Sequence, residues 1–175
     1  MPRSSNPLVE FLKDAENAPL NAGDISALRH TSPEGGLDTI GFGHKLTREE
    51  VKSGKVYGIP LSQLDMESAE AILRRDIEKH SKALDKELRK AHGVKLSELS
   101  PRKQMMLIDY QYNLGSAVRK FPSFTEAVVQ GDDSRQKDEM IRTFEDAHGV
   151  RKPLARNGQF FNAFMSAEAK QRLGE

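Results

Sequence analysis

The sequence predicts an α+β fold that is mainly α: a small N-terminal lobe with a short β-sheet, joined by a long helix to a helical lobe. Residues 39–44 alternate in the manner of a strand, residues 65–91 keep one helical pattern, and the remainder shows helical patterns separated by glycine and proline. The 175 residues, 37% of them hydrophobic, suit a single domain, 1–175. We divide it at about 7–64, 65–92 and 93–175.

Composition excludes several classes of function. Lys and Arg number 27 against 26 Asp and Glu, so the basic excess typical of nucleic-acid binding proteins is missing. No apolar run approaches the roughly 18 residues that span a bilayer, and no apolar stretch follows the positive charge at the N-terminus. The absence of cysteine fits a reducing compartment. We therefore expect a soluble monomer made in the cytoplasm without a signal peptide, and neither nucleic acid nor a membrane as partner.

The N-terminal lobe begins with a short helix. Asn6-Pro7 is a cap followed by a first-turn proline, and apolar residues then recur at helical spacing up to Glu16. The pattern breaks over 17–36, and residues 39–44 form a small β region. Thr47 opens another helix with a capping box, and 54–60 is a connection.

The rest of the chain is predicted to be helical. A broad apolar face runs from about residue 65 to 91, which indicates one long helix. Ser100-Pro101 caps a largely apolar segment that ends at Gly115 and is the best candidate for a buried central helix. Four shorter helices are expected over 124–129, 134–147, 158–165 and 167–173. A cleft between two lobes of this kind is a natural ligand site.

Glu16 is the first candidate for chemistry. It continues the apolar stripe of Leu8 and Leu12 by four further residues, so its carboxyl points along the apolar face at the helix end. Partial burial and the negative end of the helix dipole both favour the protonated form that a general acid must hold. The alternative is an exposed glutamate at a fraying terminus.

Thr39 and the loop before it supply the second group of candidates. Thr39 shares one side of the predicted strand with Gly41 and Gly43, whose missing side chains would let a ligand lie against the backbone. The alternative is an ordinary strand residue beside a turn. His30, Glu34 and Asp38 could each activate water, and alternation turns Asp38 away from Thr39. Glu34 and His30 therefore remain, although both also fit a polar loop.

No metal or cofactor is expected. No two of the five histidines have the spacing of a helical ligand pair, and no glycine-rich loop has phosphate-binding form. They are His30, His44, His80, His92 and His148.

These residues together resemble a known family. Glu16 at a helix end, the string Asp38-Thr-Ile-Gly-Phe-Gly-His-Lys-Leu-Thr47, and Tyr112-Asn-Leu-Gly115 in a buried helix are similar to the phage-type lysozymes of glycoside hydrolase family 24. The matching order of segments runs from about residue 7 to 165. The resemblance implies a lysozyme-like fold and cleavage of the β-1,4 bond between N-acetylmuramic acid and N-acetylglucosamine in bacterial peptidoglycan.

Carried over, the resemblance makes Glu16 the acid and Thr39 a residue that holds the attacking water. It also implies that Asn113 contacts the sugar and that Arg156 lies near the acid. The segment from Glu16 to Thr39 is about eight residues longer than in typical members, and no aspartate stands at the usual distance before Thr39. Glu34 or His30 must replace that aspartate, or activity depends mainly on Glu16, as in a transglycosylase that forms an anhydro sugar.

A structural ion pair is expected between His44 and Asp76. His44 ends the strand on the inward side shared with Ile40 and Phe42, and Asp76 continues the buried face of the long helix. Family members pair these two positions. A neighbouring carboxylate favours the imidazolium, so the pKa of His44 should lie above its ordinary value.

The favoured function is a phage or prophage muramidase that acts on the cell wall, either released as a lysis enzyme or carried by a virion. The alternatives are a lytic transglycosylase on the same scaffold and a catalytically inactive lysozyme fold that binds peptidoglycan.

Overall fold

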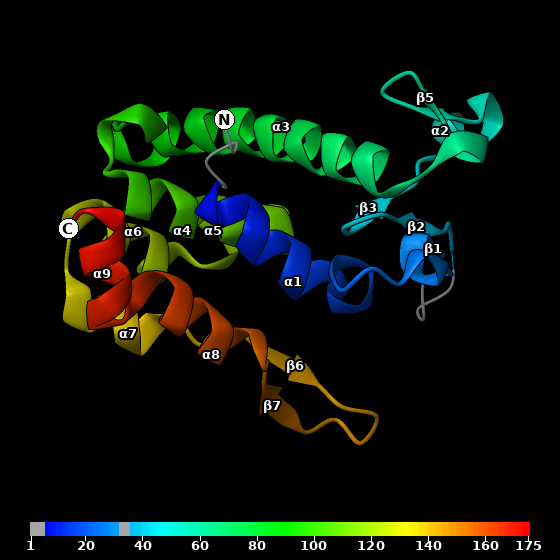
Figure 1. Ribbon diagram of the computed structural model, residues 1–175. Helices are drawn as coiled ribbons and strands as arrows, with labels where there is room; N and C mark the ends of the chain where they lie inside the picture. Colours follow the sequence, from blue (N-terminus) through cyan, green and yellow to red (C-terminus); the bar gives the residue numbers. More distant parts are fainter. Residues whose placement is uncertain (1–5, 32–35) are drawn as a thin grey trace. The chain divides into compact units, whose positions relative to one another are not determined.

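The computed structural model describes residues 6–31 and 36–175 and consists of helices with small antiparallel sheets (Figure 1). The predicted fold class is therefore confirmed. The chain divides into two compact units, residues 1–78 and 79–175, and the boundary falls inside helix α3 (Met66–His92). No helix among the described residues is both long and apolar enough to cross a membrane.

The first unit combines helix α1 with a three-stranded sheet of order β1-β2-β3. Its elements are α1 (Pro7–Asn21), the 3-10 turn η1 (Ile25–Leu28), β1 (Arg29–His30), β2 (Thr39–Ile40), β3 (His44–Lys45), α2 (Arg48–Ser53), β4 (Lys55–Val56), β5 (Ile59–Pro60), η2 (Leu61–Gln63) and the first part of α3. Ile40, Leu46, Val56 and Ile72 form a buried cluster, so this core holds the sheet against α3.

Local sequence signals explain where these helices begin. The Asn6 side chain accepts a hydrogen bond from the N–H of Leu8 at 3.0 Å and caps α1. Thr47 and Glu50 form the predicted capping box of α2. The segment 54–60, expected to be a plain connection, contains the β4–β5 hairpin, because Tyr57 and Gly58 adopt φ of +50° and +83°, as a tight two-residue turn requires.

The second unit is built around α4 (Pro101–Leu114), which packs against α5, α6, α9 and η4. Its other elements are η3 (Leu96–Glu98), α5 (Ala117–Lys120), α6 (Pro122–Gln130), α7 (Asp133–Glu139), β6 (Thr143–Glu145), β7 (Arg151–Pro153), α8 (Arg156–Phe160), the π-helical turn η4 (Phe161–Met165) and α9 (Ala167–Leu173). Tyr110 is fully buried in α4 and stacks on Phe124 with ring centroids 4.2 Å apart. The prediction of a buried central helix is confirmed.

The prediction of a helix over 134–147 is wrong for the second half of this range. Helix α7 ends at Glu139, and β6 and β7 form an antiparallel hairpin that projects from the second unit (Figure 1). The Asp146 carboxylate accepts hydrogen bonds from the N–H groups of His148 and Val150, and Gly149 has a φ of +74°. This turn chemistry outweighs the helical spacing of the segment.

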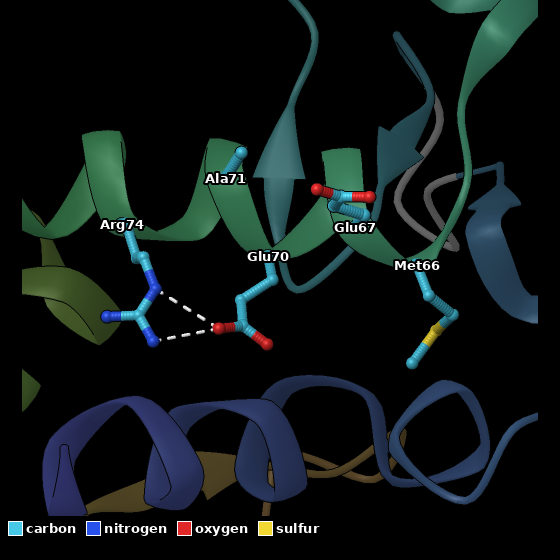
Figure 2. Close-up of a pocket in the computed structure, with 5 residues that line it drawn as sticks. All are labelled: Met66, Glu67, Glu70, Ala71 and Arg74. Carbon is cyan, nitrogen blue, oxygen red and sulfur yellow. Dashed lines mark hydrogen bonds and ion pairs between the residues drawn. The ribbon is translucent and has the colours of Figure 1, made fainter. Parts of the chain in front are cut away.

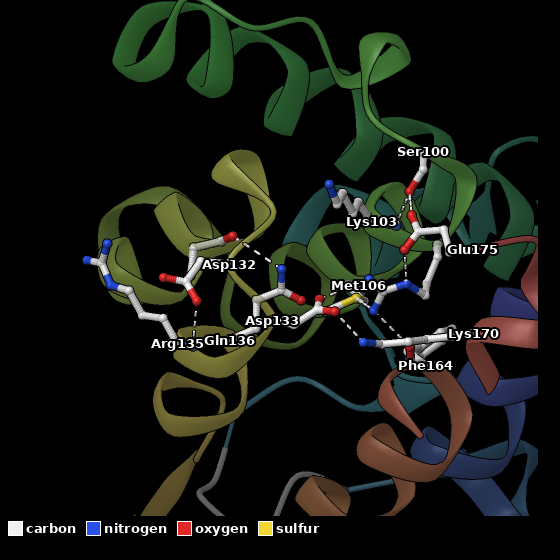
Figure 3. A network of polar contacts seen from close by, with 12 residues as sticks. Ser100, Lys103, Met106, Asp132, Asp133, Arg135, Gln136, Phe164, Lys170 and Glu175 are labelled. Atoms are coloured by element: carbon white, nitrogen blue, oxygen red, sulfur yellow. Dashed lines mark hydrogen bonds and ion pairs between the residues drawn. The ribbon is translucent and has the colours of Figure 1, made fainter. Parts of the chain in front are cut away.

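A polar network around the buried side chain of Arg102 ties α4 to the C-terminal segment. Its guanidinium donates to the Glu175 carboxylate, to the carbonyl of Phe164 at 3.1 Å and to Asp133 at 3.5 Å. Figure 3 shows Asp133, Lys170 and Glu175 converging there. The ion pair with Lys170 and the charge of Arg102 lower the pKa of Asp133. Arg102 thus bonds residues from three segments of the second unit, and we interpret the network as structural.

Candidate active site

Glu16 is the last residue of the regular first part of α1. The next residue, Asn17, has φ −155° and ψ 74°, so the helix is interrupted there before it continues to Asn21. Pro19 explains the break, because it has no N–H for the carbonyl of Ala15 and its ring crowds that carbonyl. Glu16 therefore ends a run of regular helix, as predicted, although another helical turn follows it. Its side chain is half-buried.

The Glu16 carboxyl lies against the turn between β2 and β3. A Cβ atom on Gly43 would be only 2.8 Å from Glu16 Oε2, and Gly43 has a φ of +93°. The positive φ favours glycine at position 43, and any side chain there would displace the carboxyl group. The Glu16 carboxyl therefore lies directly beside the turn of the sheet.

Residues 41–43 form this turn, whereas alternation predicted a continuous strand from 39 to 44. The glycines are the physical reason, since Gly41 and Gly43 both adopt positive φ. A Cβ atom on Gly41 would be 3.2 Å from Cβ of Ala69 in α3. The space that a side chain at position 41 would occupy, expected to admit a ligand, is therefore filled by α3, so any contact of Gly41 with substrate would have to use another part of its backbone.

Thr39 and His30 lie on one face of the sheet. Strands β1 and β2 pair with His30 opposite Thr39, and directly opposite residues of antiparallel strands share a face. Thr39 is buried and His30 is exposed. Asp38 forms an ion pair with Arg29, its Oδ2 2.6 Å from Nε, so it is engaged elsewhere. Glu34 lies outside the described residues.

His44 and Asp76 lie together in the first unit, with Nδ1 2.8 Å from Oδ2. His44 Nε2 also contacts the Glu50 carboxylate at 3.2 Å, and the hydroxyl of Tyr57 donates to Asp76 at 2.5 Å. Burial alone would lower the pKa of His44, but the hydrogen bonds and charges of Asp76 and Glu50 outweigh it and raise the pKa above its ordinary value. Sequence reasoning missed Glu50 and Tyr57.

Asn113 and Arg156 belong to the second unit, where both contact one ion network. The buried carboxylate of Asp109 bridges Arg156 Nη2 at 2.5 Å and Arg142 Nη1 at 2.9 Å. Arg142 Nη1 also donates to Asn113 Oδ1 at 3.3 Å, and its guanidinium stacks on the ring of Tyr110. The mostly buried Arg156 is thus oriented by Asp109 directly, and the exposed Asn113 is bonded by Arg142 of the same network.

Asn17 is a further polar residue of the first unit that sequence reasoning missed. Its side chain is buried, and Nδ2 donates to the carbonyls of Ala27 at 2.8 Å and Gly41 at 2.9 Å. Its Oδ1 accepts from the N–H of Leu20 at 3.3 Å. The available signal was asparagine two residues before a proline, a pattern that caps a new helical turn.

A hollow of about 400 Å³ lies beside α3. Met66, Glu67, Glu70, Ala71 and Arg74 line it (Figure 2). Glu70 accepts from Arg74 at 2.8 Å and from Lys13 at 3.2 Å, and these bonds lower its pKa. The carboxylate is therefore held ionised by its own neighbours, which suits a surface ion network better than proton transfer.

Within residues 6–31 and 36–175, no group of three or more His, Cys, Asp or Glu side chains is placed to hold a metal ion.

A comparison with solved structures supports the fold described above. The chain is similar in structure to the muramidase domain of SpmX from Asticaccaulis excentricus, with a TM-score of 0.56 and 19% identity over 93% of this chain and 97% of that chain. The comparison with curated proteins finds no match. The phage lysozyme family matches residues 24–157, which include Thr39 and His44 and begin after Glu16. Because the match covers most of the sequence, the chain belongs to the phage lysozyme family.

Proposed function

We propose that this chain is a muramidase that hydrolyses the β-1,4 bond between N-acetylmuramic acid and N-acetylglucosamine in bacterial peptidoglycan. The observation that carries the proposal is the Glu16 carboxyl, which lies at a helix break and beside Gly43 in a glycine-containing turn of the sheet. Membership of the phage lysozyme family supports the same reaction class.

In this proposal Glu16 donates its proton to the glycosidic oxygen as the bond to the anomeric carbon breaks. Water then adds to the oxocarbenium-like centre and loses a proton to a base, so the products are two sugar chains, one with a new reducing end. Thr39 holds the water from β2. His30, on the same sheet face, and Glu34 are the candidates for the base.

Asn113 and Arg156 are proposed to contact the sugar strand from the second unit. One ion network supports this role, because Asp109 holds the guanidinium of Arg156 directly and Arg142, also bonded to Asp109, donates to the Asn113 amide oxygen, which leaves both side chains few alternative rotamers. We further propose that the protein serves a phage, either in host lysis or in penetration of the wall at infection.

Product analysis tests the proposal. Purified peptidoglycan incubated with the protein should release soluble fragments whose reducing ends rise in step with the fall in turbidity. Mass spectrometry should find hydrolysed muramic acid ends. Anhydro ends would replace hydrolysis by a lytic transglycosylase reaction, and binding to walls without fragment release would identify an inactive lysozyme fold. The Glu16→Gln variant is the control for a contaminating hydrolase.

A further inference from the structure

Asn17 connects three segments of the first unit around the acid candidate. It is 7% exposed and lies at the break in α1, directly after Glu16. Its amide nitrogen bonds two backbone carbonyls from different segments, Ala27 in η1 and Gly41 in the β2–β3 turn. A buried amide that satisfies two carbonyls and caps a helical turn leaves the backbone at this point little freedom.

The same turn receives the Glu16 carboxyl two residues further on, at Gly43. The chain therefore forms a closed loop of contacts: Glu16 to Asn17 by a peptide bond, Asn17 to Gly41 by a hydrogen bond, and Gly43 back to the carboxyl by close packing. The hydrogen bond from Asn17 to the Gly41 carbonyl, at 2.9 Å, thus ties the backbone next to Glu16 to the turn that receives its carboxyl.

We infer that Asn17 is a positioning residue that sets the Glu16 carboxyl against the β2–β3 turn and so into line with the scissile bond. The inference rests on the proposed function, in which Glu16 is the general acid. Asn17 exchanges no proton with the substrate in this scheme. Its effect is transmitted through the backbone of Glu16 and through the carbonyl of Gly41.

The Asn17→Asp variant is the sharpest test. Aspartate has nearly the same volume and keeps the oxygen that accepts from the N–H of Leu20, but it replaces the donating amide by a second oxygen. That oxygen faces the carbonyls of Ala27 and Gly41, so the turn and the helix break must separate. Misplacement of a reacting group by about 1 Å can lower turnover by about 100-fold.

The matched control is Asn6→Ala. Asn6 is the other asparagine cap of α1, at the opposite end, and its side chain accepts from the N–H of Leu8. Its loss weakens the same helix without changing any contact of the β2–β3 turn. A purely structural role for Asn17 predicts that the two variants lose activity only in proportion to their loss of thermal stability.

We expect Asn17→Asp, assayed well below its Tm, to lower kcat by roughly 10- to 100-fold with KM changed less than about three-fold. Asn6→Ala should keep both constants close to those of the wild type. In a Glu16→Gln background, Asn17→Asp should cause no further loss, because it acts through Glu16. A kcat within two-fold of wild type, an equal loss in Asn6→Ala, or an additive loss with Glu16→Gln would overturn the inference.

The amide signal of Gly43 in a ¹H–¹⁵N NMR spectrum separates this inference from the proposed function. The signal should shift in Glu16→Gln and in Asn17→Asp and stay in place in Asn6→Ala. If the wild type cleaves no peptidoglycan but the signal behaves in this way, the proposed function fails and the positioning stands. If walls are cleaved and the signal does not respond to Asn17→Asp, the positioning fails and the function stands.

Discussion

Two consecutive residues of the β2–β3 hairpin, Gly43 in the turn and His44 in β3, contact carboxyl groups in different ways. In the turn, the missing side chain of Gly43 leaves room for the Glu16 carboxyl, and Asn17 bonds the carbonyl of Gly41 in the same turn. One residue later, His44 meets Asp76 and Glu50 through charge. The carboxylates around His44 favour its charged form and raise its pKa. We therefore expect substitutions at the turn to change catalysis and substitutions around His44 to change the pH dependence of stability.

The largest effect expected from this comparison is that of Glu16→Gln. The substitution keeps the size of the side chain but removes its transferable proton, so lysis of purified walls should fall by about 100- to 10,000-fold. Thermal unfolding should change little, because an amide fills the same space against Gly43. Turbidity clearance within a few-fold of the wild type, measured on the same wall preparation, would remove Glu16 from the mechanism.

Glu34→Gln and His30→Ala decide whether the acid works with a second carboxylate. If Glu34 is the base, its loss should lower kcat by about 100-fold, an effect in the range common for general bases. His30→Ala should then have a milder effect. His30 shares the sheet face of Thr39, so a larger effect of His30→Ala would make the imidazole the base. Small effects of both would favour a mechanism in which Glu16 acts without a second carboxylate.

Gly43→Ala tests whether shape holds the acid. The new methyl group would lie 2.8 Å from Glu16 Oε2 and would also force alanine into a φ of +93°. We expect kcat to fall by roughly ten-fold as the carboxyl moves, together with a loss of stability of about 1 kcal/mol.

Gly54→Ala is the control for backbone strain. Gly54 ends α2 with a φ of +65°, and a Cβ atom there would meet nothing within 4 Å. This variant should lose comparable stability, measured by chemical unfolding, and keep the wild-type kcat. Equal losses of kcat in the two variants would mean that strain, and not the contact with Glu16, lowers activity.

Asp76→Asn should have the smallest effect on activity. It should instead change how the stability of the fold depends on pH. The pKa of His44 is raised in the folded protein, so its contribution is complete below about pH 6.5 and is lost as the pH rises through the folded value. Burial would raise the pKa of Glu50, but hydrogen bonds from Thr47 and His44 lower it, so its contribution is lost as the pH falls below about 4.5. The wild type should therefore be most stable at mildly acidic pH.

Without the Asp76 carboxylate the pKa of His44 should fall, and the stability maximum should flatten by about 1–3 kcal/mol with kcat unchanged. Urea unfolding between pH 5 and 9, with an NMR titration of His44, measures both. Asp85→Asn, which removes the ion pair with Arg89 on the same helix and keeps an oxygen for the N–H of Leu96, should leave the slope above pH 6 unaltered. A pKa of His44 at or below 6.5 in the wild type would contradict the expectation that the carboxylates of Asp76 and Glu50 stabilise its charged form.

The sequence by itself determined the fold class, the long helix α3, the buried helix α4 and the caps of α1 and α2. These features depend on residues close together in the chain: apolar spacing within one helix, and a side chain that bonds an N–H two or three residues away. It also placed Glu16 at a helix end and His44 on the inward side of a strand for the same reason. The identity of the family followed from one short string, Thr39 to His44, with its surroundings.

Apart from the pair of His44 and Asp76, only the tertiary structure decided which groups meet. The filling of the space beside Gly41 by Ala69, the approach of Gly43 to Glu16 and the two carbonyls bonded by Asn17 each join segments at least ten residues apart, where spacing carries no information. The hairpin at 143–153 escaped prediction because its turn is made by one aspartate side chain and one glycine, while the residues around it keep a helical spacing. Local pattern sets the elements, and the packing of distant residues sets the site, because a carboxyl group acquires its function from the atoms that surround it.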